Sequence, residues 1–213
     1  WMHAGAVRVD NEKMSKSLNN FFTIRDVLKK YHPEVVRYFL LSSHYRSPIN
    51  YSEDNLIEAQ QGLERFYFAL QNFADVAATA QSELENSEYY QRFVTAMDDD
   101  FNTREAFSAM YDLVRELNSV AREDQNKAKE MAGELKALGE ILGVLQVDPE
   151  AFLKGSAQDE NGLSDADIDG LVAEREAAKL NKDYARADEV REELKEQGIV
   201  LEDSREGTRW RRA

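Results

Sequence analysis

The chain has 213 residues, a formal net charge of −14 and a hydrophobic content of 42%. That composition supports one or two domains with hydrophobic cores and excludes an intrinsically disordered chain. Cysteine is absent, which excludes disulfides and thiolate metal sites, and no apolar run approaches the roughly 20 residues that a membrane helix needs. We therefore expect a cytoplasmic protein with no membrane partner, and the start at Trp1 indicates a piece of a longer protein.

The charge is distributed unevenly along the chain. Residues 1–50 carry eight basic and four acidic side chains, a net charge of +4, which leaves −18 for residues 51–213. Because the chain as a whole is acidic, bulk electrostatic attraction cannot hold a nucleic acid. Any RNA contact must therefore use local basic patches, namely the first segment and the arginines around Trp210.

A short basic segment, Lys13-Met14-Ser15-Lys16-Ser17, follows the alternating residues 6–9. A strand that leads into such a loop can hold two ammonium groups and two hydroxyls against a polyphosphate, and lysine acts there as a flexible point charge. The alternative is a solvated basic loop. The pattern resembles the KMSKS signature of class I aminoacyl-tRNA synthetases, in which this loop stabilises ATP during amino-acid activation.

Two short helices are predicted next. The first runs from Phe22 to Tyr31 with Thr23 as a possible N-cap, and the second begins with Pro33 at its first helical position. Residues 47–51 are predicted to be extended, because Pro48 biases the residue before it away from helix.

Four amphipathic helices are predicted from Ser52 onward. Ser52 can cap the first, residues 89–98 form the second, the third follows Asn102-Thr103, and the fourth carries residues 131–145. Short connections between such helices predict an antiparallel bundle. The apolar stripe of the first helix consists of Leu56, Leu63, Phe66, Leu70, Phe73 and Ala77.

Three consecutive aspartates, Asp98 to Asp100, stand between the second and third of these helices. Carboxylates suggest a divalent metal site. We favour a helix boundary, in which the acids end one helix, Asn102 or Thr103 caps the next, and Phe101 packs over the join. Successive aspartates do not converge on one ion unless a loop wraps around it.

Residues 154–165 are polar, contain two glycines and predict a linker. Ser164 then opens a helix with a near capping box, residues 181–183 interrupt it, and a second helix runs from Tyr184 to Gln197. Gly198 is placed to end that helix in a left-handed conformation.

Two short strands, residues 199–201 and 208–210, end the chain and are predicted to be joined by a turn. Arginines around Trp210 offer phosphate contacts and a surface on which bases can stack. The alternative is that Trp210 covers a small core while the arginines offset local acids.

The last helix carries a line of three functional candidates. Tyr184, Asp188 and Arg191 are spaced i, i+4 and i+7 and therefore lie along one face. An aromatic ring, an acceptor and a planar donor can stack on and pair with unstacked bases. An ion pair between Asp188 and Arg191 on a solvated face explains the spacing equally well.

The whole chain resembles the C-terminal part of bacterial cysteinyl-tRNA synthetases. The matching segments are residues 1–3, 13–18, 36–40, 44–47, 50–52, 97–103, 183–191, 198–203 and 207–212.

The resemblance implies a mainly α fold. Its expected parts are a KMSKS loop and stem-contact region (residues 1–51), a helical bundle similar to the DALR anticodon-binding class (52–153), a linker (154–163) and a small C-terminal α/β module that recognises the anticodon (164–213). Lys13 and Lys16 would be the catalytic loop residues, with Lys16 as the ATP contact. The anticodon contacts would be Lys179, Tyr184, Asp188, Arg191 and Asp203, supported by Trp210.

The implied enzyme, a cysteine–tRNA ligase, activates cysteine with ATP and magnesium and transfers it to cysteine tRNA. The His-x-Gly-His turn and the cysteine-selecting zinc site of this family are not in these residues, since the only histidines are His3, His32 and His44. We expect this segment to bind no metal and not to catalyse alone. The alternatives are a free-standing helical adaptor for tRNA or protein, and a related ligase acting on a small amine, against which the anticodon-segment match argues.

Overall fold

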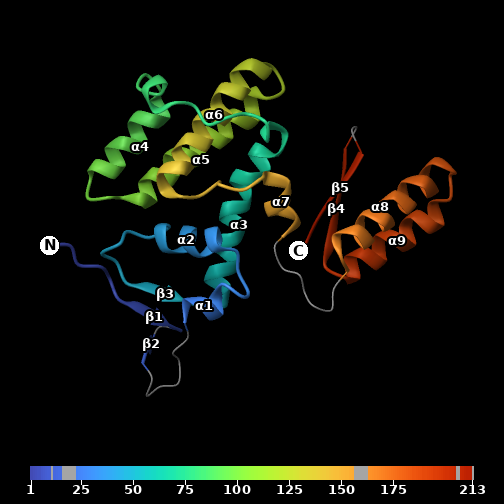
Figure 1. Cartoon of the computed structure of the whole chain (residues 1–213), viewed down its shortest axis with the longest axis horizontal. Helices are drawn as coiled ribbons and strands as arrows, with labels where there is room; N and C mark the ends of the chain where they lie inside the picture. The colour runs from blue at the N-terminus through green and yellow to red at the C-terminus, as the bar shows by residue number, and fades with distance from the viewer. Residues whose placement is uncertain (11, 16–22, 156–162, 205–206, 213) are drawn as a thin grey trace. The chain divides into compact units, whose positions relative to one another are not determined.

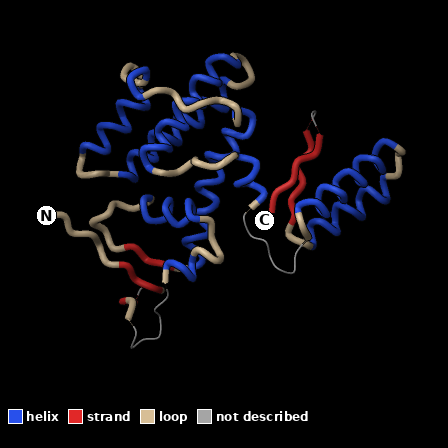
Figure 2. Tube along the Cα trace, in the orientation of Figure 1, coloured by secondary structure: helices blue, strands red, loops and turns tan. Residues whose placement is uncertain are grey.

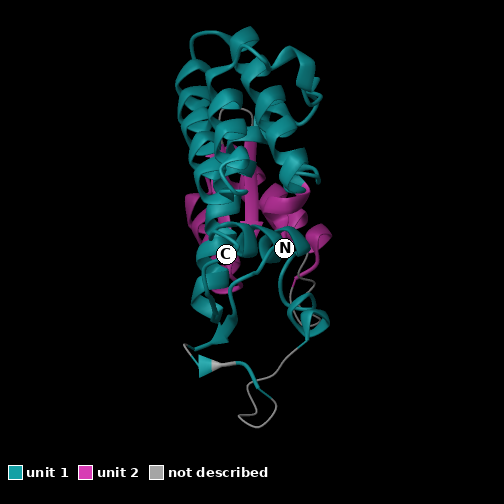
Figure 3. Ribbon diagram, turned by 90° about the vertical axis from the view of Figure 1, so that its left-hand side faces the viewer, with its two compact units in different colours: residues 1–150 teal, residues 151–213 magenta. Residues whose placement is uncertain are grey.

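The computed structural model describes residues 1–10, 12–15, 23–155, 163–204 and 207–212. It divides into two compact units, Trp1–Glu150 and Ala151–Ala213 (Figure 3). Helices make up most of the described chain, with one small sheet in each unit (Figures 1 and 2). Across these described ranges, no helix combines the length and apolar character required to cross a bilayer. The predicted fold class, mainly helical with a small C-terminal module, is confirmed.

The first sheet contains three short strands, β1 (Val7–Val9), β2 (Glu12–Lys13) and β3 (Ile49–Tyr51). Strand β1 lies in the middle, antiparallel to β2 and parallel to β3. Just before β1, the Gly5 amide donates to the Tyr45 carbonyl at 2.7 Å. A Cβ at Gly5 would come within 2.1 Å of the Ser47 carbonyl oxygen, so only glycine permits this close approach.

Helices α1 (Ile24–Val27) and α2 (Pro33–Leu41) follow. Thr23 caps α1 with a full capping box, as predicted. The helix is shorter than the predicted range to Tyr31. Turns follow α1 up to Tyr31. Pro33 disfavours helical backbone at His32, which instead caps α2 through Nδ1.

The four predicted bundle helices are present as α3 (Glu53–Leu70), α4 (Glu88–Asp98), α5 (Thr103–Val120) and α6 (Gln125–Leu142). Ser52 and Asn102 cap α3 and α5 as predicted. Two short 3-10 turns, Gln71–Phe73 and Gln81–Glu83, lie between α3 and α4. The prediction that Phe101 packs over the α4–α5 join is wrong, because its side chain is 53% exposed.

Helix α3 ends at Leu70, so the predicted continuation of its stripe to Ala77 is wrong. Beyond this end, the Lys136 ammonium on α6 donates to the carbonyls of Phe73, Ala74 and Val76 at 2.8, 3.0 and 2.6 Å. A cation that collects carbonyls beyond a helix C-terminus is favourable there and replaces helical partners. Phe73 remains buried although it lies outside the α-helix.

A buried carboxylate ties α2 to the rest of this unit. Glu34 accepts from the Tyr67 hydroxyl at 2.6 Å and from the backbone amides of Leu145 and Gln146 at 2.8 and 2.9 Å. The charge is therefore buried with hydrogen bonds on both oxygens, which is the condition under which a carboxylate is tolerated in a core.

The second unit contains α8 (Asp165–Leu180), α9 (Tyr184–Glu196), β4 (Ile199–Ser204) and β5 (Gly207–Arg212), while α7 (Pro149–Lys154) spans the division between units. Ser164 caps α8 with a capping box and Gly198 has a φ of +73°, both as predicted. The predicted hairpin is present, with Leu201 opposite Trp210. The domain boundaries expected at residues 51 and 153 stay predictions.

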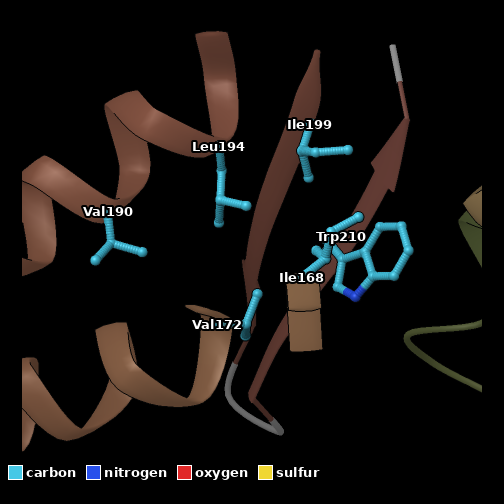
Figure 4. Close-up of a cluster of buried hydrophobic side chains, with 6 residues drawn as sticks. All are labelled: Ile168, Val172, Val190, Leu194, Ile199 and Trp210. Carbon is cyan, nitrogen blue, oxygen red and sulfur yellow. The ribbon is translucent and has the colours of Figure 1, made fainter. Parts of the chain in front are cut away.

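The core of the second unit lies between the helix pair and the hairpin (Figure 4). It consists of Ile168, Val172, Val190, Leu194, Ile199 and Trp210. The apolar stripe of α9 faces this core, so the opposite face of α9 stays exposed.

Candidate functional site

Arg175 organises the polar end of the second unit. Its side chain comes from α8 and is only 4% exposed. Its two terminal nitrogens donate to the two carboxylate oxygens of Asp203 on β4, each at 2.8 Å. This two-point contact holds the pKa of the Asp203 carboxyl far below its usual range and raises that of Arg175.

Asp203 uses all of its acceptor capacity within the protein. Besides Arg175, it accepts from the Thr208 hydroxyl at 2.7 Å and from the Lys179 ammonium at 3.1 Å. A carboxylate offers about four acceptor positions. A base could therefore pair with Asp203 only by displacing Lys179 or Thr208.

The predicted line on α9 is exposed. Tyr184 is 64% exposed, and Asp188 and Arg191 also face solvent. The Asp188 charge contributes to the raised pKa of Arg175, which places this carboxylate in the same electrostatic environment as the Arg175–Asp203 pair. The structure thus presents an aromatic ring, a carboxylate and a guanidinium along one free helix face.

Trp210 is a core residue. It is 5% exposed, and its indole nitrogen donates to Asp169 at 2.6 Å. The cations of Lys154 and Arg212 lie 5.0 and 5.1 Å from its ring centroid. The predicted stacking surface is therefore wrong for this side chain, and the alternative, that Trp210 covers the small core, is confirmed (Figure 4).

The nearby arginines are also engaged within the protein. Arg212 pairs with Asp165 at 2.7 Å and donates to the carbonyls of Lys154 and Leu163. Arg211 pairs with Glu202 at 3.5 Å. These two arginines offset local acids, which was the alternative to direct phosphate contact.

The basic loop is described only in part. Lys13 ends β2 and pairs in register with Arg8 on β1. Lys16 and Ser17 lie outside the described residues. The strand predicted at residues 6–9 is present as β1, whereas the strand at Glu12–Lys13 was not predicted. The ATP roles of both lysines stay predictions.

Asp100, the last of the three consecutive aspartates, joins the bundle to the N-terminal segment. It accepts from the Tyr45 hydroxyl at 2.6 Å and from Arg46 Nε and Nη2 at 2.5 and 3.0 Å. These donors lower the pKa of Asp100 to about 2. Because the Tyr45 carbonyl accepts from Gly5, this contact also supports the backbone that leads into β1.

The helix boundary at these aspartates is confirmed. Asp98 ends α4, Asp99 is its C-cap, and Asn102 caps α5. Among the described residues, no group of three or more histidine, aspartate or glutamate side chains is arranged to hold a metal ion.

Sequence reasoning missed Arg175. The available signal was its position on the buried stripe of α8, at i+7 from Ile168 and i+3 from Val172. A charged residue on an apolar stripe is rarely buried without a partner, so the pattern required an acid elsewhere. The spacing within α8 alone could not identify Asp203 as that acid.

Three family models match the chain in sequence order. They are the tRNA synthetases class I (C) catalytic domain over residues 1–61, the DALR domain over residues 92–146 and the cysteinyl-tRNA ligase anticodon binding domain over residues 162–211. The Arg175–Asp203 pair and the exposed line on α9 lie in the third of these regions.

Curated relatives match over nearly the entire chain. The cysteine–tRNA ligase of Azotobacter vinelandii is 54% identical over 99% of this chain and 44% of its own length. That of Hahella chejuensis is 51% identical over 100% of this chain and 46% of its own length. The chain thus spans less than half the length of these relatives.

Among solved structures, the LeuRS of a LeuRS–tRNA–LeuAMS ternary complex from Agrobacterium radiobacter K84 matches 66% of this chain and 20% of its own, with a TM-score of 0.48 and 25% identity. The three family models, which match in sequence order, agree with the curated relatives. The chain therefore belongs to the cysteine–tRNA ligase family and corresponds to the C-terminal part of its members.

Proposed function

We propose that this chain is the tRNA-binding part of a cysteine–tRNA ligase, which activates cysteine with ATP and attaches it to cysteine tRNA. The observation that carries the proposal is the exposed line Tyr184, Asp188 and Arg191 on α9, within the region that matches an anticodon-binding domain. The first unit would support the KMSKS loop, and the second would recognise the anticodon.

Asp188 is the most discriminating member of this line. Carboxylates repel phosphates, so Asp188 assists RNA binding only by accepting from the amino or imino groups of bases. Tyr184 offers a ring on which an unstacked base can lie, and Arg191 offers a planar donor. Specific contacts of this kind are needed because a chain with a net charge of −14 has no bulk attraction for RNA.

Asp203 and Lys179 would form a second set of contacts to the anticodon loop. Arg175 and Thr208 fix the Asp203 carboxylate, and the partly exposed Lys179 lies against it. We propose that Lys179 leaves Asp203 to contact the anticodon loop, which would free one carboxylate position for a base. Trp210 acts through the core that holds β4 and β5 together.

Lys13 and Lys16 would offset the charge that develops on the phosphates of ATP as pyrophosphate leaves. The donor set of the loop, two ammonium groups and two hydroxyls, suits magnesium-bound triphosphate. A zinc site does not fit this segment, since the sequence lacks cysteine and the described residues contain no cluster of ligands. Zinc, cysteine and the remaining ATP contacts would belong to the catalytic domain.

The test is binding of the chain to two anticodon stem-loops, one with the cysteine anticodon GCA and one with an unrelated anticodon. Asp188→Ala should weaken binding of the GCA loop by about 1–3 kcal/mol, the range for a lost base contact, and slightly improve binding of the other. Glu193→Ala, which removes an exposed acid from another face of α9, is the matched control.

Unchanged or better binding of both loops by Asp188→Ala would make Asp188 a surface charge and contradict the proposed anticodon face. Equal affinity of the unmodified chain for both loops would instead favour an RNA-binding adaptor without anticodon recognition.

A further inference from the structure

A groove of about 640 Å³ lies between α2, α3 and α5 of the first unit. Its floor is a pair of tyrosines, with the Tyr38 and Tyr111 hydroxyl oxygens 2.7 Å apart. The Tyr111 hydroxyl also lies 3.0 Å from the Gly62 carbonyl, to which it can donate. A Cβ at Gly62 would stand 2.9 Å from the Tyr38 hydroxyl, so this glycine permits the close packing. The floor is thus fixed by three helices.

The rim of the groove is basic. Arg65 comes from α3, and Arg104 and Arg115 come from α5, whereas Asp112 is the single carboxylate among the lining residues. Asp112 is shared, because it pairs with both Arg92 and Arg115. The lining residues therefore concentrate positive charge within a chain whose net charge is −14.

Two of these arginines are available to a ligand. Both Arg65 and Arg104 are exposed, and neither forms an ion pair with any part of the chain that the structure describes. Arg65 also acts on the groove floor: burial raises the pKa of the Tyr38 and Tyr111 hydroxyls, and the Arg65 charge opposes that rise. The two hydroxyls are satisfied by each other and by the Gly62 carbonyl, so the donors that remain for a ligand are those of the arginines.

The donors extend along α5. Arg104, Ser108, Arg115 and Asn118 all line the groove and are exposed. Arg104 and Arg115 are 11 positions apart in the helix, which corresponds to about 16 Å along its axis at 1.5 Å per residue. A single phosphate group cannot reach both. A polynucleotide can, because its backbone repeats one negative charge every few ångströms.

We infer that this groove binds the phosphodiester backbone of RNA, with Arg65, Arg104 and Arg115 contacting phosphates and Ser108 and Asn118 adding neutral hydrogen bonds. Guanidinium groups suit this role because their planar donors contact phosphate at two points. The inference rests on the proposed function, since the RNA would be the tRNA whose anticodon the second unit recognises. Contacts of this kind position RNA and carry no sequence information.

The experiment measures binding of the full chain to labelled cysteine tRNA over a series of salt concentrations, by fluorescence anisotropy. The variant is the double substitution Arg65→Gln and Arg104→Gln. Loss of two phosphate contacts should reduce the slope of log K against log salt by about 1.4–1.8. If the two chains bind equally at 1 M salt, the same relation predicts about 25- to 60-fold weaker binding of the variant at 0.1 M salt.

Two controls separate this effect from general losses. Lys129→Gln removes one charge from an exposed position on α6, outside the residues that line the groove, and should leave the slope nearly unchanged. A tRNA with an altered anticodon should lose the same factor as the cognate tRNA in the double variant. The thermal unfolding midpoint should be unchanged, because both arginines are exposed.

Failure of this inference can be distinguished from failure of the proposed function. If the unmodified chain prefers the GCA anticodon but the double variant keeps its affinity and slope, the groove does not bind RNA and the proposed function stands. If the double variant loses affinity and slope while the unmodified chain shows no anticodon preference, the groove stands and the proposed function fails.

Discussion

The substitution Asp203→Asn tests whether this residue stabilises the fold or forms hydrogen bonds with RNA bases. The substitution keeps the size of the side chain and one carbonyl-type oxygen, which can still accept from Arg175 Nη1 and the Thr208 hydroxyl. It replaces the oxygen that accepts from Arg175 Nη2 and Lys179 by a donor. Arg175, with a side chain only 4% exposed, is then left without a charged partner on β4.

The expected loss is about 2 kcal/mol of unfolding free energy in the second unit. Removing one partner of a fully buried ion pair costs about 3–5 kcal/mol, whereas an exposed pair contributes about 0–1 kcal/mol. The Arg175–Asp203 pair lies between these limits, because one side chain is buried and the other is 51% exposed. The Lys179 contact adds little, since both of its partners are solvated.

Tryptophan emission during urea unfolding of the full chain measures this loss. The sequence contains two tryptophans. Trp1 is fully exposed and Trp210 is 5% exposed, so the shift in emission reports on the second unit. Glu202→Gln is the matched control, because it makes the same kind of chemical change one residue earlier on β4, in a longer, partly exposed pair with Arg211. An unchanged midpoint for Asp203→Asn, combined with lost anticodon preference, would show that Asp203 reads bases and does not hold the fold.

Two further predictions follow from the same contacts and from the loop. The folded-state pKa of the Asp203 carboxyl is lowered from 3.8, so the stabilisation by its ion pair is present above about pH 4 and is lost as the pH falls toward the folded-state pKa. The difference in urea midpoint between the unmodified chain and Asp203→Asn should therefore narrow below pH 4. A difference that stays constant with pH would contradict the ion pair. In the complete ligase, Lys16→Ala should slow ATP–pyrophosphate exchange with cysteine by roughly 10²–10³-fold, the usual loss on removing one transition-state donor, and an unchanged rate would remove Lys16 from the ATP site.

Features set by neighbouring residues were predictable from the sequence. Ser52, Ser164 and Asn102 each accept from the backbone amide of the third residue of the helix that they precede, so the signal and its effect lie within one helical turn. Gly198 likewise follows from the local need for a left-handed residue after α9. The exposed line on α9 was also predictable, because helical spacing alone determines which residues share a face.

Features set by distant residues were not predictable. The Lys136 ammonium donates to the carbonyl of Phe73 beyond α3, 63 positions away, and Glu34 accepts from the amide of Leu145, 111 positions away. Arg175 and Asp203 are 28 positions apart, and each resembles an ordinary surface charge within its own element. For Trp210 the sequence left stacking and burial open, and the packing of α8 against the hairpin decided the outcome.

The ion pairs formed by the arginines indicate which unit supplies affinity for RNA and which supplies specificity. In the second unit, Arg175 and Arg212 are bound to acids of the same unit, whereas Arg65 and Arg104 in the first have no such ion pair among the described residues. General attraction for the RNA backbone should therefore come from the groove of the first unit, and base recognition from α9 of the second.

This division predicts additive effects in a double-mutant cycle. The two sites share no residue and belong to different compact units, and substitutions at independent sites usually add within about 0.3–0.5 kcal/mol. The free-energy loss of the combined Arg65→Gln, Arg104→Gln and Asp188→Ala variant on cysteine tRNA should thus equal the sum of the losses of its parts. The salt slope should change only with the arginines, and the anticodon preference only with Asp188. A coupling well above 0.5 kcal/mol would show that the groove and α9 do not act independently on the same RNA.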